Sequence, residues 1–338
     1  MEILENASLK AFNTFGIEAK AAKMARFSSA ADLREIFSDE ALKSMPRLIL
    51  GGGSNLLLTS DFDGLVLKNE VPGIELIKED DHYFYVKSGA GENWHEFVMH
   101  CIENGWAGLE NLSLIPGNVG ASPMQNIGAY GVEVKDRFHE LEAFNLETLE
   151  TEIFDAEACQ FGYRESVFKR KLKDKYIIVS VTFRLFKTPQ LNTTYGAIQG
   201  ELNSLGITEP TIEDVSRAVV NIRSSKLPDP KVIGNAGSFF KNPVVPEAVY
   251  RKLVDENPSM PFYPAPDGQY KLAAGWLIEK SGWKGFLRGN HGVHAKQALV
   301  LVNHGGATGK QIYDLSTEIL ADVKKKFGVE LEREVNIV

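Results

Sequence analysis

Residues 113–132 of the 338-residue chain read SLIPGNVGASPMQNIGAYGV. Glycine recurs in this stretch among small and amide residues, at Gly117, Gly120, Gly128 and Gly131. Glycine has no Cβ, so it exposes the main chain, and it loses more conformational freedom than any other residue when a loop becomes ordered. An irregular loop would account for this composition. We favour the alternative, a ligand pressed against the main chain.

A second glycine cluster lies upstream, where residues 48–58 read LILGGGSNLLL. The apolar runs on both sides of Gly51–Gly53 predict two short strands joined by a glycine turn. Leu56 stands where the third glycine of a dinucleotide fingerprint belongs, and no Lys-Ser or Lys-Thr pair follows, so the segment is neither a Rossmann motif nor a P-loop. The turn either cradles an anion with its backbone N–H groups or is a plain tight turn.

Strand and helix patterns alternate along the rest of the chain, without an internal repeat. Residues 82–86 predict a strand that ends in a turn at 87–91. Apolar residues at helical spacing between 94 and 102 predict an amphipathic helix that buries Cys101. Alternation over 176–186 predicts a strand with one buried face. The sequence therefore indicates a mixed α and β protein.

A polar stretch at 187–210 contains Pro and Gly and has weak periodicity, which predicts a domain linker or a mobile loop. Thr211 and Asp214 then resemble a helix capping box. The helix that follows buries an apolar stripe made of Val215, Ala218, Val219 and Ile222. We expect a second unit of the chain to begin with this helix.

The C-terminal region predicts a helix and a final strand. Thr308 and Gln311 form another capping box, and Gly328 supplies the C-terminal stop. From 329 to 337 apolar residues alternate with Glu330, Glu332, Glu334 and Asn336, which predicts a strand with its carboxylates on one face.

Composition excludes several classes of protein. The chain has 37 basic and 45 acidic side chains, a net charge of −8, which argues against nucleic acid or an anionic membrane as the main partner. With 43% hydrophobic and 24% charged residues it is an ordinary globular chain of two or three cores. The only cysteines, Cys101 and Cys159, are too few for a disulfide-stapled fold. Without a signal peptide or spanning segment, we expect a soluble cytoplasmic protein, and, without a coiled-coil stripe, a monomer.

Two segments concentrate reactive side chains, FGYRES at 161–166 and GNAGSFFKNP at 234–243. Their pattern alone favours a structural ion pair for Arg164 and a turn hydroxyl for Ser238. It does not separate Glu334 from Glu332, which share a strand face. The pair at His291 and His294 lacks a third ligand at sensible spacing, so we predict no metal.

These motifs identify a family. In chain order they are LILGGGSNLLL, SLIPGNVGASPMQNIGAYGVEV, FGYRESVFK, KLPDPKVIGNAGSFFKNP, KLAAGWLIEKSGWKG and LEREV. The chain resembles the UDP-N-acetylenolpyruvoylglucosamine reductases from Asn13 to Glu334. The loop around Tyr195 and the FGYRES form resemble the class that carries a tyrosine lid over the substrate.

The resemblance implies an α+β fold, with a two-part FAD-binding domain of the vanillyl-alcohol-oxidase type followed by a smaller α+β substrate-binding domain. The expected boundaries are 1–70 for the first FAD-binding subdomain, 71–205 for the second with the Tyr195 lid loop, and 206–338 for the substrate domain. The last strand would return Glu334 to the active site.

The resemblance also implies a reaction, the FAD-mediated and NADPH-dependent reduction of UDP-N-acetylglucosamine enolpyruvate to UDP-N-acetylmuramate in peptidoglycan precursor synthesis. Arg164 and Glu334 would stabilise the enolate-like intermediate, and Ser238 would donate the proton. A guanidinium can hold both oxygens of a carboxylate as negative charge grows beside it. Lys226 and Lys241 would help a serine act as an acid.

Binding residues also follow from the resemblance. Those expected to hold FAD are Gly51, Gly52, Gly53, Ser54, Asn55, Pro116, Gly117, Gly120, Ala121, Ser122, Gln125, Asn126, Gly128, Ala129, Tyr130 and Gly131. Those expected to hold the nucleotide sugar are Tyr195, Lys226, Asn242, Tyr263 and Gln297. Two alternatives stay open, a flavin-linked oxidase of the same architecture and a catalytically silent nucleotide-sugar sensor.

Overall fold

The computed structural model describes residues 2–338, and their contacts divide the chain into two compact units. The first unit holds the residues up to Ala7, Ala21–Gly52 and Asp63–Ser225, and the second holds Ser8–Lys20, Gly53–Phe62 and Lys226–Val338. These are packing units. The three domains expected from the sequence are defined by the ligand that each would bind, and they stay a prediction.

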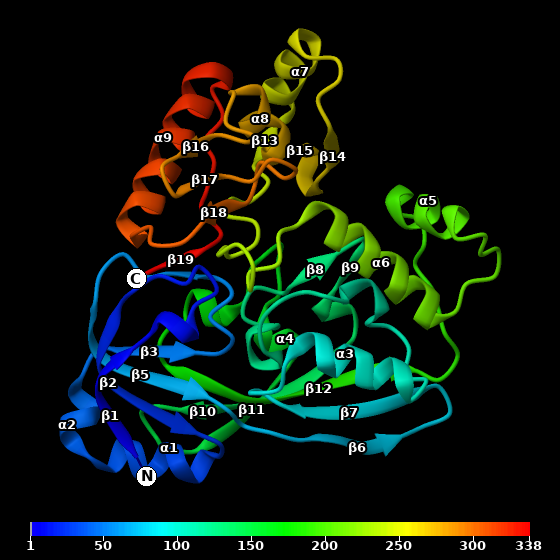
Figure 1. The fold of residues 1–338 in the computed structure, drawn as a ribbon. Helices are drawn as coiled ribbons and strands as arrows, with labels where there is room; N and C mark the ends of the chain where they lie inside the picture. Colours follow the sequence, from blue (N-terminus) through cyan, green and yellow to red (C-terminus); the bar gives the residue numbers. More distant parts are fainter. Residues whose placement is uncertain (1) are drawn as a thin grey trace. The chain divides into compact units, whose positions relative to one another are not determined.

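A four-stranded sheet and two helices form one part of the first unit (Figure 1). The strand order is β1 (Ile3–Ser8), β2 (Lys20–Phe27), β5 (Phe62–Asn69) and β3 (Arg47–Leu50). The helices are α1 (Ala30–Ser38) and α2 (Glu40–Ser44). The Ser29 side chain caps α1, and Leu33 and Phe37 pack with Phe27 in a buried core.

A five-stranded antiparallel sheet forms the other part of the first unit. Its strand order is β11 (Thr151–Asp155), β10 (Phe138–Asn145), β12 (Tyr176–Phe186), β7 (Tyr83–Gly89) and β6 (Ile74–Glu79). The predicted strands at 82–86 and 176–186 are confirmed. However, β7 continues through Lys87–Gly89, where the sequence predicted a turn.

The prediction of one buried face for β12 was wrong, because Ser180 and Thr182 are buried as well. The neighbouring strands explain their burial. In the register, Thr182 lies beside Lys87 of β7, and Ser180 lies beside Glu142 of β10. Lys87 and Glu142 form an ion pair of 2.8 Å that therefore spans the polar face of β12. Long charged side chains thus cover the small polar ones.

Helix α3 (Trp94–Glu103) packs on this sheet (Figure 1). The Asn93 side chain accepts the first N–H groups, and the Phe97 ring lies 5.1 Å from the Phe183 ring. The predicted helix is confirmed, and Cys101 is buried in its core face. The remaining short elements of the first unit are η2 (Glu110–Leu112), η3 (Val119–Ala121), β8 (Gly128–Ala129), β9 (Val132–Glu133), η4 (Val134–Asp136), α4 (Ala156–Cys159) and η5 (Val167–Lys169).

The stretch predicted as a linker or mobile loop contains helix α5 (Gly196–Ser204). Ile198 and Leu202 of α5 pack against Ala218 and Val219 of α6 (Ile212–Lys226), so tertiary packing orders a segment of weak periodicity. The predicted capping box and apolar stripe of α6 are confirmed. Almost all of this helix groups with the first compact unit, whereas we expected it to begin the second.

The second unit combines small sheets with helices. Its helical segments are η1 (Lys10–Phe12), α7 (Glu247–Glu256), η6 (Pro266–Gly268), α8 (Ala274–Lys280) and α9 (Gly309–Phe327). Its strands are β13 (Val244–Pro246), β15 (Gln269–Leu272) and β14 (Phe262–Pro264) in one sheet, β16 (Leu287–Arg288), β17 (His291–Val293) and β18 (Leu301–Asn303) in another, and β4 (Leu56–Leu57) with β19 (Asn336–Ile337) in a third.

The predicted C-terminal helix is confirmed in α9, with the Thr308–Gln311 capping box and a left-handed Gly328 at its end. The predicted strand over 329–337 was largely wrong. Only Asn336–Ile337 is a strand, although Val329, Leu331 and Val335 are buried as the alternation required. The backbone before β19 makes an isolated bridge at Arg333, whose guanidinium bonds to the side chains of α9.

Within residues 2–338, no helix is long and apolar enough to cross a membrane.

Candidate active site

The two glycine segments touch each other in the first unit. A Cβ added to Gly52 would lie 2.9 Å from the Gly117 Cα atom and 2.7 Å from the Asn118 Oδ1 atom. The Asn118 side chain in turn donates a hydrogen bond to the Gly91 carbonyl. The predicted cofactor residues Gly52 and Gly117 therefore lie side by side, and neither has a side chain that would keep a ligand away from the main chain.

The segment that follows packs against the end of β7. The Gly120 N–H donates to the Ala90 carbonyl at 3.0 Å, and a Cβ on Gly120 would lie 2.5 Å from the Ala90 Cβ. Ser122 is buried, and its Oγ has no hydrogen-bond partner among residues 2–338. An unsatisfied buried hydroxyl costs roughly 1–3 kcal/mol, so a bound group that pairs with it fits this site.

Asn126 is occupied within the protein. Its Nδ2 donates to Glu133 at 3.0 Å and to the Gly162 carbonyl at 3.0 Å, and its Oδ1 accepts the Lys135 N–H at 3.0 Å. The residue is fully buried and has a left-handed φ of 45°. These bonds make Asn126 a brace of the loop that follows Gln125. Contacts of both with a cofactor stay a prediction.

A hairpin turn carries the end of the glycine segment. Gly128 and Ala129 of β8 pair with β9, and the turn residues Tyr130 and Gly131 have φ values of 50° and 80°. Positive φ at both central positions is typical of type I′ turns, where tyrosine is strained and glycine is not. The hairpin thus carries four predicted positions, and the Gly128, Tyr130 and Gly131 carbonyls each accept a hydrogen bond within the protein.

Arg164 is held against this hairpin. Its guanidinium donates to the Gly128 carbonyl at 2.8 Å, and its own backbone has a φ of 54° in the tight turn between Gly162 and Glu165. Next to it, the Ser166 hydroxyl donates to the Met124 carbonyl at 2.6 Å. The catalytic arginine of the prediction therefore lies directly beside the predicted cofactor loop.

Arg223 adds a second half-buried cation to the first unit. Its Nε donates to the Leu114 carbonyl at 3.2 Å, and burial lowers the pKa of its guanidinium. Burial also raises the pKa of the Tyr130 phenol, an effect that the nearby Arg223 partly opposes. The Tyr130 ring meets the Tyr195 ring edge-on, with 5.4 Å between centroids. Tyr195 precedes helix α5 and has an exposed fraction of 41%.

In the second unit, the chain around Ser238 meets the C-terminal segment. Ser238 bridges to Val300, and the next residue, Phe239, accepts the Glu334 N–H at 2.9 Å. Two predicted catalytic residues, Ser238 and Glu334, therefore come from neighbouring backbones. The Glu334 carbonyl accepts a hydrogen bond from Asn55 at 3.3 Å, which joins it to the glycine turn.

The rest of that turn is fixed within the second unit. Gly53 has a φ of 62°, and a Cβ there would lie 2.0 Å from the Phe12 carbonyl oxygen. Thr14 donates its N–H to the Gly53 carbonyl at 3.1 Å. Only glycine fits at this position, and Ser54 and Asn55 follow it directly.

The predicted substrate residues of the second unit fall into two groups. Asn242 accepts the Ala274 N–H at 2.9 Å, and the Gln297 Oε1 atom lies 3.2 Å from the Cβ position of Gly275. Both residues therefore lie beside the first turn of α8. Tyr263 lies on the edge strand β14, with an exposed fraction of 42%, and Lys226 is the exposed last residue of α6.

The three carboxylates expected on one strand face have different environments. Glu330 and Glu332 are exposed and pair with Lys324 at 2.6 Å and with Lys241 at 2.5 Å, and the Glu334 residue is half-buried. The sequence pattern did not distinguish Glu332 from Glu334 as the candidate site residue, and the two residues differ in their surroundings in the structure. Lys241, which we expected to assist Ser238, contributes its charge to Glu332.

Lys68 is a candidate that sequence reasoning missed. Its half-buried ammonium donates to the Gly51 carbonyl at 3.0 Å, and burial lowers its pKa. It is the only charged residue in the apolar run at 64–68, and that isolation was a usable signal. Asn111 and Asn192, which bond to the hairpin turn at Tyr130, were missed as well.

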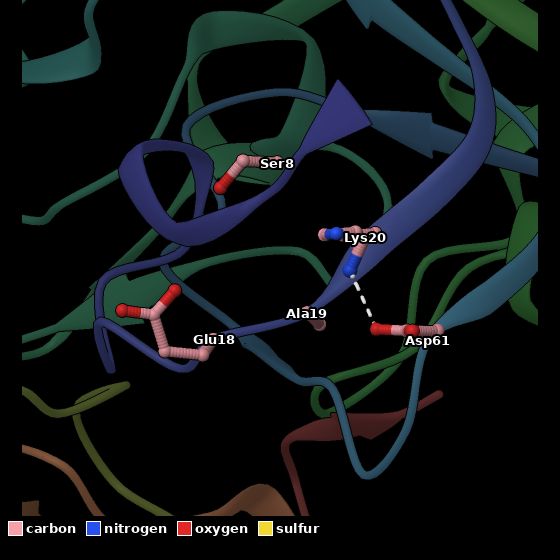
Figure 2. A pocket seen from close by; sticks show the side chains of 5 residues that line it. All are labelled: Ser8, Glu18, Ala19, Lys20 and Asp61. Atoms are coloured by element: carbon pink, nitrogen blue, oxygen red, sulfur yellow. Dashed lines mark hydrogen bonds between the residues drawn. The ribbon is translucent and has the colours of Figure 1, made fainter. Parts of the chain in front are cut away.

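Other hollows and clusters do not compete with this site. A pocket of about 150 Å³ is lined by Ser8, Glu18, Ala19, Lys20 and Asp61, and the Lys20 N–H donates to Asp61 across it (Figure 2). This volume is below the roughly 300–1,000 Å³ of typical ligand sites, and the lining includes no predicted residue. Among residues 2–338, no cluster of His, Cys, Asp and Glu is suited to a metal ion.

Comparisons with known proteins identify both halves of the chain. A family model described as an FAD binding domain matches residues 21–148, and one described as the C-terminal domain of UDP-N-acetylenolpyruvoylglucosamine reductase matches residues 229–338. The order of the two confirms the expected succession of an FAD-binding and a C-terminal domain.

Full-length relatives agree with the family models. The UDP-N-acetylenolpyruvoylglucosamine reductase of Flavobacterium johnsoniae is 51% identical over 100% of both chains. That of Chromobacterium violaceum is 52% identical over 99% of this chain and 98% of its own. The crystal structure of the reductase from Thermus caldophilus matches with a TM-score of 0.65 and 22% identity over 99% of this chain and 98% of its own, a likeness of fold.

Proposed function

Because the chain belongs to the UDP-N-acetylenolpyruvoylglucosamine reductase family, it is a flavoprotein oxidoreductase of peptidoglycan synthesis, and we propose that it takes electrons from NADPH and uses Ser238 as its proton donor. The full-length match at 51% identity carries this proposal. In the proposed reaction, hydride and a proton add across the double bond of UDP-N-acetylglucosamine enolpyruvate to give UDP-N-acetylmuramate.

The glycine segments would hold the cofactor. FAD, when bound, supplies the hydride that adds to the vinyl group. The bare main chain at Gly52 and Gly117 would admit its diphosphate, and the buried Ser122 hydroxyl would gain a partner. The ammonium of Lys68 beside Gly51 adds positive charge where that diphosphate would lie. The other predicted FAD contacts belong to the same proposal.

Arg164 would bind the carboxylate of the enolpyruvyl group. Hydride addition places negative charge on the carbon beside that carboxylate, and a fixed guanidinium stabilises such charge without reorganisation. The bond from Arg164 to the Gly128 carbonyl and the tight turn at 162–165 support this role, because both hold the side chain in place.

Ser238 and Glu334 would act from the second unit. A positioned hydroxyl can protonate an enolate, since an enolate in a closed site is a strong base. The bond between the Glu334 N–H and Phe239 supports the pairing of these two residues. We propose that Glu334 orients the intermediate while Ser238 gives its proton to the carbon beside the carboxylate.

The remaining predicted residues would bind the nucleotide sugar. Asn242 and Gln297 both lie beside the first turn of α8, which supports a shared subsite. Lys226 and the two tyrosines, Tyr195 and Tyr263, would contact the diphosphate, sugar and uracil. We further propose the division at 1–70, 71–205 and 206–338 as the functional domains, in a cytoplasmic monomer.

An absorbance titration tests the proposed donor and acceptor together. We expect the flavin band of the purified protein to bleach on addition of NADPH without oxygen, and to return on addition of the enolpyruvyl nucleotide sugar. Bleaching by an alcohol or lactone in place of NADPH would indicate an oxidase instead. A flavin band that NADPH leaves unchanged would contradict the proposal.

A Tyr195→Phe variant tests the tyrosine lid. A hydrogen bond from the phenol to a charged phosphate is worth roughly 1.5–3 kcal/mol, so we expect KM for the nucleotide sugar to rise about 10- to 150-fold. The rate of flavin reduction by NADPH should stay at the wild-type value, which serves as the internal control. An unchanged KM would remove Tyr195 from the substrate site.

A further inference from the structure

We propose that Asn111 and Asn192 are positioning residues that couple the hairpin turn at Tyr130–Gly131 to the segment bearing Tyr195. The proposal rests on the proposed substrate role of Tyr195. It explains how Tyr195 is held near the proposed cofactor loop. Neither asparagine needs to touch substrate or cofactor. Both act through the backbone that they hold.

Asn111 bonds to both segments at once. It is 1% exposed and lies in the short helix η2. Its Nδ2 donates to the Tyr130 carbonyl at 3.0 Å and to the Asn192 carbonyl at 2.9 Å. Because both partners are acceptors, the amide nitrogen must face them, and the orientation of the side chain is fixed.

Asn192 completes a triangle of hydrogen bonds. Its Nδ2 donates to the Gly131 carbonyl at 3.1 Å. Its Oδ1 accepts from the Thr194 hydroxyl at 2.8 Å and from the Thr194 N–H at 3.3 Å, one residue before Tyr195. Two successive carbonyls of the hairpin turn are therefore bound by two side-chain amides, and the Asn111 amide also binds the backbone carbonyl of Asn192.

The ring contact gives this triangle a consequence. The Tyr130 and Tyr195 rings meet edge-on at 5.4 Å, so the hairpin turn contacts the Tyr195 segment both through backbone and through side chains. Tyr130 has a strained φ of 50°, which persists only when the surroundings over-determine it. Hydrogen bonds to the carbonyls of Tyr130 and Gly131 supply that restraint. A turn held in this way fixes the Tyr130 ring, and the Tyr130 ring in turn positions the Tyr195 ring that packs against it.

Hydrogen exchange of the full-length holoenzyme measures the coupling directly. We expect Asn111→Ala to speed exchange of the amides at 190–195 about tenfold, the factor that corresponds to about 1.4 kcal/mol. Asn111→Asp should have at least that effect, because its carboxylate would face two carbonyl oxygens. Amides of the central strand β12 should exchange at the wild-type rate.

A matched control separates coupling from general loss of stability. Asn145 also donates two bonds from its amide, to Glu152 at 2.7 Å and to Tyr176 at 3.1 Å, in the hairpin between β10 and β11. Asn145→Ala should leave exchange at 190–195 within about twofold of wild type. If it accelerates these amides as much as Asn111→Ala does, the coupling proposal is wrong.

Steady-state kinetics give a second readout. The variant for this measurement is Asn192→Ala, which should disturb folding less than Asn111→Ala because Asn192 is only half-buried. We expect its KM for the enolpyruvyl nucleotide sugar to rise about tenfold, with kcat and flavin reduction near wild type. Adding Tyr195→Phe should then raise KM less than it does in wild type, since coupled residues are not additive. Fully additive effects would overturn the coupling.

The two readouts separate the possible failures. If Tyr195→Phe alone leaves KM unchanged, the proposed substrate role of Tyr195 fails, and the exchange rates at 190–195 still decide whether the asparagines hold the segment. If exchange is unchanged in Asn111→Ala, Asn111→Asp and Asn192→Ala, the coupling is rejected whatever the kinetics show.

Discussion

A Ser238→Ala enzyme will be reduced by NADPH at the wild-type rate and will be reoxidised by the enolpyruvyl substrate about 10²- to 10⁴-fold more slowly, the usual contribution of a general acid. Reduction needs no proton from this hydroxyl, whereas completion of the product needs one at carbon. The substitution removes one oxygen from a residue whose backbone bridge to Val300 does not involve the side chain, so we expect the fold to persist.

Anaerobic double-mixing stopped-flow at the flavin band separates the two half-reactions of this variant. Ser281→Ala is the matched control, because its hydroxyl also lies in the second unit and only donates to the Leu277 carbonyl at 2.9 Å. That control should match wild type in both steps. If the flavin of Ser238→Ala is reoxidised at the wild-type rate, another group donates the proton.

Local signals in the sequence predicted the helices well. Both capping boxes, at Thr211 and at Thr308, form in the structure with the bonds that the motif requires. The core face of α3 also follows the predicted helical spacing through Cys101. These features depend on residues three or four apart, and such contacts can be read directly from a single sequence.

Contacts between distant residues could not be predicted in the same way. Helix α5 has a weak pattern, and it is ordered because Ile198 and Leu202 pack on α6. The polar face of β12 is buried because Lys87 and Glu142 come from its two neighbouring strands. In each case a partner far along the chain decides the outcome, and the local pattern gives no sign of it.

The candidate site also combines residues that local sequence predicts with residues that depend on distant contacts. Its glycine segments stand out in the sequence because main-chain exposure requires glycine locally. Asn111, Asn192 and Lys68 do not stand out, because each acts through a carbonyl that another part of the chain supplies. Arg164 and Ser238 became candidates through the family motifs, since their patterns alone favoured a structural ion pair and a turn hydroxyl.

A Gly52→Ala protein will lose most of its bound flavin. The new Cβ would lie 2.9 Å from the Gly117 Cα atom, well inside the carbon–carbon contact distance. Because the obstacle is backbone, it cannot rotate away, and the two glycine segments must separate. Overpacking of this kind costs roughly 1–3 kcal/mol, which would weaken FAD binding about 5- to 150-fold.

Purification of this variant in the presence of FAD, followed by fluorescence titration of the stripped protein, measures the loss. Gly51→Ala is the informative neighbour, because its Cβ would lie at an ordinary 3.6 Å from Asn118, and it should weaken FAD binding less than Gly52→Ala. Gly200→Ala, which has open space around the added Cβ in α5, controls for the loss of a glycine elsewhere in the first unit. If Gly52→Ala retains flavin as well as Gly200→Ala does, the contact between the two glycine segments is not what holds the cofactor, and the FAD site must lie on other residues.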